Sequence, residues 1–263
     1  MKLAIRNLDI LFGTRHTVQM EELDVDAGEI VGLVGESGSG KSMTASAVLG
    51  LAQRVGATVR GSITLDGMEL VGASDAVLRT VRGRRIAMIF QSPSGAFNPV
   101  MRVGDVFART LKLHGVASRS DARARAERAL TEVLLPTTAL DRYPHQLSGG
   151  QLQRVAIALA LALDAEVLLA DEPTSALDVT VQAEVLELMT TLRTRGLAVL
   201  LITHDLGVVA EVADRVAVMQ AGRIVEVGPT AAVLSTPTSE YTRILLASVP
   251  KMKSALGGGS SGA

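Results

Sequence analysis

The sequence predicts an α/β protein built on a mainly parallel sheet, with an N-terminal antiparallel β subdomain and a helical subdomain. Three observations lead to this prediction. Short apolar runs that suit buried strands alternate with stretches of helical periodicity, which is the pattern of crossover connections in a parallel sheet. Alternating segments with a hairpin signal lie in the first part of the chain. Residues 92–163 are mostly helical in pattern.

The first part of the chain predicts a small antiparallel sheet beside the main core. Residues 3–10 alternate in polarity with an irregularity in the middle, which indicates two short strands or one bulged strand. Residues 59–71 repeat the alternation and contain Asp66-Gly67, a hairpin turn signal.

A glycine-rich loop between a strand and a helix is the strongest single motif in this part. Residues 29–42 read EIVGLVGESGSGKS, an apolar strand followed by the phosphate-loop pattern G-x-x-x-x-G-K-[ST]. Backbone N–H groups of such a loop and the positive end of the next helix bind phosphate. An ordinary glycine-rich turn is the alternative, which the Lys-Ser pair disfavours. The residues expected to bind a nucleoside triphosphate are Gly35, Glu36, Ser37, Gly38, Ser39, Gly40, Lys41 and Ser42.

Helical patterns dominate the middle of the chain. After a short strand predicted at residues 86–90, helices are expected over 103–113 and 118–135, the second with a capping-box pattern from Ser118 to Asp121. A further helix is expected from Ser148 to about residue 163.

Two buried strands are predicted in the last third, at residues 167–170 and 197–203, with a helix over 179–195 between them. A short helix over 206–213 and a hairpin around 215–227 follow. The predicted organisation is one domain over residues 1–240, with its core at 1–91 and 164–240, a helical subdomain at 92–163, and an extension at 241–263 that ends in a flexible Gly/Ser tail.

Polar side chains follow several of the buried strands, and ligands of parallel sheets bind at the carboxyl ends of the strands. Asp171 can orient ligands around Mg²⁺, and its neighbour Glu172 can act as general base toward water. The Gln91 amide can reach the metal or the water, and His204 can hydrogen-bond the terminal phosphate. Each residue alone has an ordinary structural explanation, but their occurrence at one sheet edge favours a catalytic site, with Ser42, Gln91 and Asp171 as metal ligands.

A second glycine motif, Ser148-Gly149-Gly150-Gln151, begins a predicted helix, and a helix start is another anion-binding geometry. The chain has a single phosphate loop, so a second phosphate-binding edge has no nucleotide of its own to bind. We therefore expect a dimer in which this edge of each chain closes over the nucleotide of the other.

Composition narrows the classes of function. The 263 residues are 48% hydrophobic and 2% aromatic, which predicts a large aliphatic core. A net charge of −1 disfavours nucleic acid as the main partner, and the absence of cysteine excludes disulfides and thiolate metal sites. We expect no signal peptide and no membrane span, because the longest apolar stretch, residues 155–170, is interrupted by acidic residues and is shorter than the roughly 20 residues that a span requires.

Together these motifs resemble the ATP-binding cassette (ABC) transporter ATPases over essentially the whole chain. The matching segments are GESGSGKS at 35–42, Gln91, LSGGQLQRVAIA at 147–158, VLLADEPTSALD at 167–178 and His204. The resemblance implies a RecA-like phosphate-loop fold, ATP and Mg²⁺ as ligands, and hydrolysis of ATP to ADP and phosphate.

The resemblance also implies roles for single residues. Glu172 is then the catalytic base, His204 senses the γ-phosphate, and Ser148 to Gln151 contact ATP across the dimer. Residues 175–178 link the two sites, with Asp178 at the nucleotide. Phe12, 23 residues before Gly35, takes the place of the aromatic residue that stacks on adenine, although a buried sheet residue is the alternative.

Four stretches resemble the dipeptide, oligopeptide and nickel importer branch: MIFQSPSGAFNPVMRVG, YPHQLSGG, ALDVTVQAEVL and SEYTRILLASVP. The GAFNP segment favours the nickel-type subset, and the chain lacks the longer tail, sometimes with a cysteine cluster, that peptide members often carry. This branch implies a peripheral subunit on the cytoplasmic face of the membrane that imports a small solute, peptide or nickel chelate. Its implied partners are a second ABC ATPase chain (a paralogue, or a second copy), two transmembrane permease subunits and, indirectly, an extracytoplasmic solute-binding protein. The alternatives are an exporter ATPase, a non-transport ABC ATPase that acts on nucleic acid or ribosomes, and a scaffold that binds ATP without hydrolysing it, which the presence of Glu172 and His204 disfavours.

Overall fold

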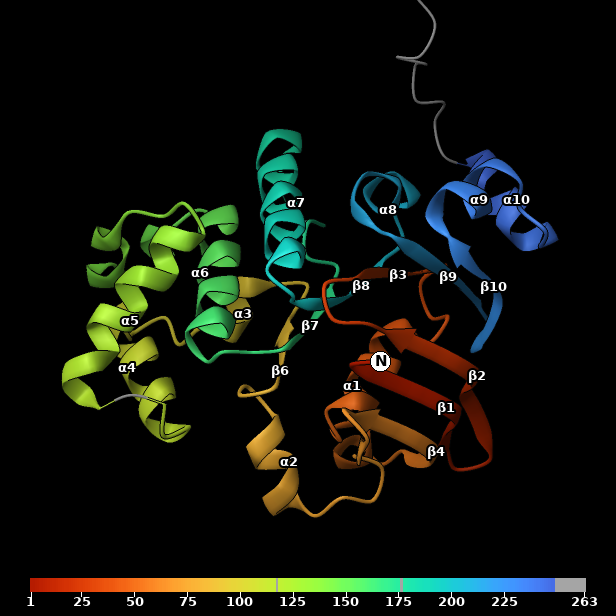
Figure 1. Cartoon of the computed structure of the whole chain (residues 1–263), viewed down its shortest axis with the longest axis horizontal. Helices are drawn as coiled ribbons and strands as arrows, with labels where there is room; N and C mark the ends of the chain where they lie inside the picture. Colours follow the sequence, from red (N-terminus) through yellow and green to blue (C-terminus); the bar gives the residue numbers. More distant parts are fainter. Residues whose placement is uncertain (117, 176, 249–263) are drawn as a thin grey trace, which may run out of the picture.

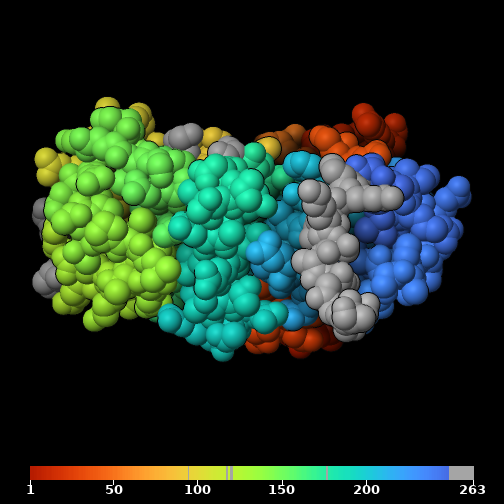
Figure 2. Space-filling model, turned by 90° about the horizontal axis from the view of Figure 1, so that it is seen from above, coloured from red at the N-terminus to blue at the C-terminus, as the bar shows by residue number. Residues whose placement is uncertain are grey.

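The computed structural model describes residues 1–116, 118–175 and 177–248. The two sheets and α1 (Lys41–Val48) form one part of the molecule. Helices α3 to α6, within residues 93–162, gather in a lobe at one end (Figure 1). From above, this helical lobe and the C-terminal helices lie at the two ends of an elongated body, with α7 between them (Figure 2). The α/β architecture predicted from the sequence is confirmed.

The antiparallel sheet has the strand order β2-β1-β4-β5. Its strands are β1 (Leu3–Phe12), β2 (Arg15–Val25), β4 (Thr58–Leu65) and β5 (Met68–Glu69). The first segment is one bulged strand, because the pairing of β1 with β4 shifts register between Arg6 and Asp9, where Asn7 has a positive φ of 47°. The predicted irregularity is therefore a bulge. Strand β2 was not predicted.

The main sheet has the order β10-β9-β3-β8-β7-β6, and only the β9–β10 pair is antiparallel. Every residue of β3, β7 and β8 is buried, as expected for parallel strands covered on both faces. This burial places the strand before the phosphate loop at the centre of the sheet. The strands are β3 (Ile30–Val34), β6 (Ile86–Ile89), β7 (Val167–Asp171), β8 (Ala198–Thr203), β9 (Arg215–Gln220) and β10 (Arg223–Pro229).

The helices cover the sheet and form the lobe. They are α1 (Lys41–Val48), α2 (Asp75–Val81), α3 (Pro93–Ala96), α4 (Val103–Leu113), α5 (Arg119–Glu132), α6 (Gly149–Ala162), α7 (Val179–Thr194), α8 (Leu206–Val212), α9 (Thr230–Ser235) and α10 (Glu240–Ser248). Short 3₁₀ turns lie at Ala52–Val55, Thr137–Asp141 and Pro144–Gln146.

One helix boundary differs from the prediction, and four helices extend it. Helix α5 ends at Glu132, earlier than the predicted residue 135, because Leu134 has a φ of 58° that a helix cannot continue through. Helices α2, α3, α9 and α10 were not predicted. The stretch 155–170 divides between α6 and β7, and among the residues that the structure describes no helix has the length and apolarity to cross a membrane.

Apolar side chains form separate clusters on the two faces of the main sheet. One cluster joins the lobe to the sheet and includes Phe107 and Leu130 together with Leu168 and Leu201. The other lies between the main sheet, α1 and the antiparallel sheet. A third cluster joins β9 to α8, α9 and α10 and includes Val34, the last residue of β3. The strand that carries the phosphate loop is therefore held by apolar packing on all sides.

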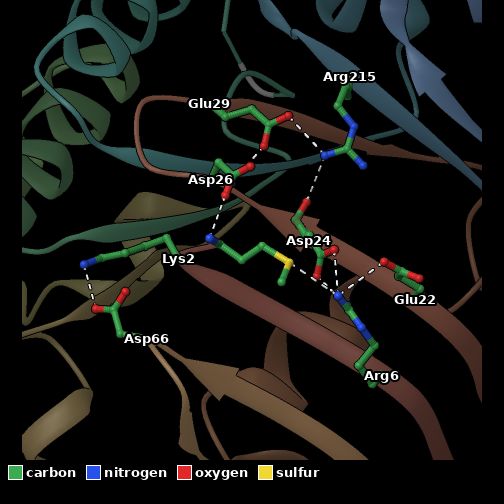
Figure 3. Close-up of polar contacts among 9 residues, drawn as sticks. Lys2, Arg6, Glu22, Asp24, Asp26, Glu29, Asp66 and Arg215 are labelled. Atoms are coloured by element: carbon green, nitrogen blue, oxygen red, sulfur yellow. Dashed lines mark hydrogen bonds and ion pairs between the residues drawn. The ribbon is translucent and has the colours of Figure 1, made fainter.

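Charged side chains connect the two sheets near the start of β3, as Figure 3 shows. Arg215 of β9 donates a hydrogen bond of 3.1 Å to Glu29, which directly precedes β3, and a longer one to the backbone carbonyl of Asp24 in β2. The Asp24 carboxylate in turn pairs with Arg6 of β1. These contacts fix the edge of the antiparallel sheet against the base of the central strand.

Candidate nucleotide-binding site

The phosphate loop occupies residues 35–40, between the end of β3 and the start of α1. A side chain at Gly35 would overlap the backbone carbonyl oxygen of Met219 in β9. Gly40 has a φ of 109°, and a Cβ there would lie 2.8 Å from a methyl group of Val18. Both glycines are therefore required by close approach of neighbouring strands, and the loop is shaped by the sheet on which it sits.

Lys41 points back into the loop. Its ammonium donates hydrogen bonds to the carbonyl oxygens of Gly35 (2.7 Å) and Glu36 (2.8 Å), and the residue is only 7% exposed. Burial lowers the pKa of Lys41, although the carboxylates of Glu172 and Asp171 oppose this shift. A buried ammonium beside a curled backbone is placed to meet the negative charge of a phosphate.

A cleft of about 750 Å³ lies over the loop and gathers most of the predicted residues. Side chains from the ends of separate strands meet here, since Gln91 follows β6, Glu172 follows β7 and His204 follows β8. The lining residues are Thr17, Gly35, Glu36, Ser37, Gly38, Gly40, Lys41, Ser42, Met43, Gln91, Glu172, His204, Leu245 and Ser248. The structure therefore brings Gln91, Glu172 and His204 together at one edge of the sheet, as the sequence predicts.

The Ser42 hydroxyl donates a hydrogen bond of 3.0 Å to Oδ1 of Asp171. Burial raises the pKa of Asp171; the Ser42 hydrogen bond opposes this effect, while the charge of Glu172 adds to it. In the described part of the chain no three His, Cys, Asp or Glu residues cluster as a metal site. The pair of Ser42 and Asp171, with its single carboxylate, fits Mg²⁺, which commonly takes one or two protein carboxylates and completes its shell with water and phosphate oxygens.

Replacing Asp171 with Asn is expected to stabilise the nucleotide-free chain. The raised pKa means that the folded state holds the Asp171 proton more tightly than the unfolded state, so stability falls as pH rises through that interval. At neutral pH the ionised carboxylate is thus a net cost, which Asn removes while Oδ1 still accepts the Ser42 hydrogen bond. Thermal melting at pH 7 should show an increase of about a few °C. Asp105→Asn, an exposed change on α4, should not raise the midpoint, and a lower midpoint for Asp171→Asn would contradict the argument.

Glu172 is held in an unusual backbone conformation next to His204. Its φ is 50°, in the left-handed region that non-glycine residues seldom occupy, and such strain is found mostly at functional sites. Oε1 of Glu172 lies 2.7 Å from Nδ1 of His204 and accepts a hydrogen bond of 3.1 Å from the His204 backbone N–H. The backbone N–H of Glu172 donates to Ile202 in β8. The carboxylate is thus fixed at the cleft with an exposed imidazole as its partner.

Several predicted nucleotide contacts are not among the residues that line this cleft, including Ser39, which is buried within the loop. Phe12, at the end of β1, is partly buried and packs on the apolar cluster between the two sheets, as in the alternative interpretation of this residue. Asp178 caps α7, where its side chain accepts a hydrogen bond of 3.1 Å from the Val181 N–H. Contact of either residue with nucleotide stays a prediction. Ala176, in the predicted link between sites, lies outside the described residues.

The second glycine motif forms the start of α6, and none of its residues lines the cleft. Ser148 and Gln151 make a reciprocal capping box, with bonds of 3.2 Å and 3.0 Å between side chain and backbone. Ser148 and Gly149 are exposed, while a side chain at Gly150 would overlap Val181 of α7. The motif is therefore a preformed helix start that faces outward, away from the phosphate loop of its own chain.

Sequence reasoning missed the contribution of the C-terminal helix. Leu245 and Ser248 of α10 line the cleft, and the hydroxyl of Tyr241 accepts a hydrogen bond of 3.1 Å from the Glu36 N–H. The SEYTRILLASVP stretch that contains these residues marked a branch of proteins but gave no sign of contact with residue 36. Thr17 and Met43 were also missed, and both are neighbours of the loop rather than parts of a motif.

Comparisons with known proteins agree with this geometry. The ABC transporter family model matches residues 18–175. The glutathione import ATP-binding protein GsiA of Salmonella typhimurium is 46% identical over 263 residues, covering 95% of this chain and 42% of its own length. GsiA of Escherichia coli O157:H7 has the same identity and coverage. The chain thus spans less than half the length of these curated relatives.

Solved structures show the same fold. The structure of cbiO1 from Clostridium perfringens, described as part of the ABC transporter complex cbiONQ, has a TM-score of 0.78 and 25% identity, covering 89% of this chain and 91% of that one. The ATP-binding cassette MJ0796, solved as a dimer in a post-hydrolysis state with ADP and Pi, has a TM-score of 0.74 and 28% identity, covering 87% and 98% of the two chains.

Proposed function

This chain belongs to the ABC transporter family of ATPases, and on that premise we propose that it binds and hydrolyses ATP to drive uptake of a small solute. One observation carries the proposal: a single cleft joins the buried Lys41 ammonium to the Glu172–His204 pair. A phosphate-binding cation and a carboxylate facing the same space are what hydrolysis of a terminal phosphate requires.

The residues of the cleft divide the chemistry between them. Lys41 and the loop N–H groups bind the β- and γ-phosphates, and Glu172 accepts a proton from the attacking water. His204 hydrogen-bonds the γ-phosphate and orients the Glu172 carboxylate, to which it is already joined. Ser42, Asp171 and Gln91 would hold Mg²⁺, which supplies charge neutralisation at the phosphate oxygens.

A second chain completes the site in this proposal. Ser148 and Gly149 are exposed at a helix start, and neither lies in the cleft of its own chain. Backbone N–H groups at a helix start bind anions, so this surface suits the phosphates held by another ATPase chain. We infer that two cassettes, this chain with a paralogue or with a copy of itself, close over two ATP molecules.

The proposed contact with membrane subunits rests on the segment that leads from the cleft into the helical lobe. Gln91 lies in the cleft, and the chain runs from it directly into the helical lobe. Phe90 and Val100, on either side of α3, are 48% and 78% exposed, which gives this segment an apolar surface. We propose that two transmembrane permease subunits contact this region and that the chain is peripheral on the cytoplasmic face of the membrane, with an extracytoplasmic solute-binding protein delivering the cargo.

The proposed cargo is a small peptide. The relatives are named for import of glutathione, a tripeptide, and this favours peptides over the nickel chelates suggested by the GAFNP segment. Cargo does not touch an ATPase subunit of this kind, so the proposal rests on similarity to relatives of which this chain covers 42%, and on no residue of the cleft.

The experiment is an ATPase assay of the purified chain assembled with its permease subunits in vesicles. Solute-binding protein loaded with short peptides should stimulate phosphate release and carry peptide across the membrane. Stimulation by nickel chelates alone would contradict the peptide assignment, and movement of solute out of the cytoplasmic side would indicate an exporter. Stimulation by DNA or ribosomes, without permeases, would indicate a non-transport ATPase.

A further inference from the structure

We propose that Tyr241 is a positioning residue for the phosphate loop, and that α10 is in this way part of the nucleotide site. The inference rests on the proposed function of ATP binding. Glu36, the second residue of the loop, is held from two sides. Its backbone N–H donates to the Tyr241 hydroxyl at 3.1 Å, while its carbonyl accepts from the Lys41 ammonium at 2.8 Å.

The Tyr241 ring is fixed where it lies. The residue is 8% exposed and packs in the apolar cluster with Val34, which immediately precedes the loop, and with Val218 of β9. A phenol locked by packing presents its oxygen at a constant position. The N–H of Glu36 therefore has one defined partner, and the loop has one defined starting direction.

The start of α10 is itself anchored to the sheet. The buried Glu226 carboxylate of β10 accepts hydrogen bonds from the backbone N–H groups of Thr238 (2.7 Å) and Ser239 (3.1 Å) and from the Thr238 hydroxyl (2.9 Å). Burial opposes ionisation of Glu226, but these hydrogen bonds outweigh it, so the pKa of Glu226 is lowered. The helix that carries Tyr241 thus begins at a point fixed by an ionised carboxylate.

The other end of the helix reaches the cleft. Leu245 and Ser248 lie one and two turns beyond Tyr241 and line the same space as the loop. The helix is therefore placed along the loop from Glu36 to the cleft mouth. Figure 1 shows α9 and α10 together beyond β9 and β10, on the side of the molecule opposite the lobe. Tyr241, Leu245 and Leu246 of this helix pack in the apolar cluster that joins it to β9, α8 and α9.

A fixed loop binds phosphate better than a mobile one, because apparent affinity scales with the fraction of molecules whose loop is competent. Tyr241→Phe keeps the ring and its packing and removes the hydroxyl that accepts the Glu36 hydrogen bond. One hydrogen bond sets the scale of the effect, so we expect Mg·ATP to bind roughly 3- to 10-fold more weakly. Because the loop contacts phosphates, inorganic tripolyphosphate should lose affinity by the same factor. In hydrolysis assays the KM for ATP should rise while kcat stays within about twofold.

Tyr143→Phe is the matched control, since Tyr143 lies beside Arg102 and His145 in the lobe and makes no contact with the loop. It should bind Mg·ATP like the wild type. Glu226→Gln, which weakens the anchor of α10, should change affinity in the same direction as Tyr241→Phe. Titration of the full chain with fluorescent ATP, with melting curves in parallel, measures these effects.

Two results would overturn the inference: wild-type affinity in Tyr241→Phe, or a loss for ATP without a loss for tripolyphosphate. The proposed function fails in a different way. If the wild-type chain binds neither ATP nor tripolyphosphate, then ATP binding itself is wrong; if the wild type binds both and the variant matches it, only the role of Tyr241 is wrong.

Discussion

Replacing Glu172 with Gln is expected to reduce ATP turnover by at least about 100-fold, the lower limit for loss of a general base. Gln keeps the shape of the side chain, and its Oε1 can still accept the hydrogen bond from the His204 backbone. What it loses is the capacity to take a proton from water. Binding of Mg·ATP should persist, because Lys41 and the phosphate loop are unchanged.

The measurement is phosphate release together with nucleotide titration on the same preparation. Size-exclusion chromatography in excess Mg·ATP should show the variant accumulating as a closed pair of cassettes, since hydrolysis no longer separates them. Glu187→Gln, an exposed change on α7, supplies the control and should hydrolyse ATP normally. Normal turnover in Glu172→Gln would show that the general base has been assigned to the wrong residue.

The meeting of polar residues at one edge of the main sheet could be predicted from the sequence because the strands end sharply. The strands end at Val34, Ile89, Asp171 and Thr203, and a polar or glycine residue follows within two positions of each. Parallel strands place those positions at one edge, so the meeting of Gln91, Glu172 and His204 in one cleft followed from topology alone. The Ser42–Asp171 hydrogen bond joins residues 129 apart, both of which were predicted as metal ligands at this edge.

The contribution of α10 could not be predicted because it depends on docking and on no local pattern. Tyr241 and Glu36 are 205 residues apart, and nothing in a short helix after Pro237 indicates which surface it covers. An isolated helix of this length is marginal in water, so its conformation is decided by packing against the sheet. Strand β2 was missed for a related reason, since adjacent Glu21 and Glu22 interrupt its alternation, and pairing with β1 supplies what the pattern lacks.

Phe12 illustrates a different limit. A count of residues from the phosphate loop suggested a contact with adenine, but the side chain's direction depends on the register of β1. That register shifts at two places along the strand, once against β4 and once against β2 between Ile10 and Leu11. A spacing rule does not contain this information; the ring packs against the apolar cluster between the sheets, and its contact with adenine stays a prediction.

Lys41 has the largest expected effect on nucleotide binding. In the free chain Lys41 is 7% exposed, and burial lowers its pKa, so the charge is held at a cost. Two loop carbonyls partly offset that cost. A bound phosphate offsets it further, and this difference between the free and bound states is what the charge contributes to affinity.

Lys41→Met is therefore expected to weaken binding of Mg·ATP by about 100-fold or more, the equivalent of one or two charge-assisted hydrogen bonds. Met fills the same space as Lys41. The lowered pKa of Lys41 means that folding disfavours the charge that Met removes, so the melting temperature of the nucleotide-free chain should change little. This distinguishes loss of a ligand contact from unfolding. Lys112→Met, at an exposed position near the end of α4, is the matched control and should bind like the wild type. Isothermal titration decides the matter: an affinity of Lys41→Met within tenfold of the wild type would mean that the loop backbone, and not the ammonium, provides most of the binding energy.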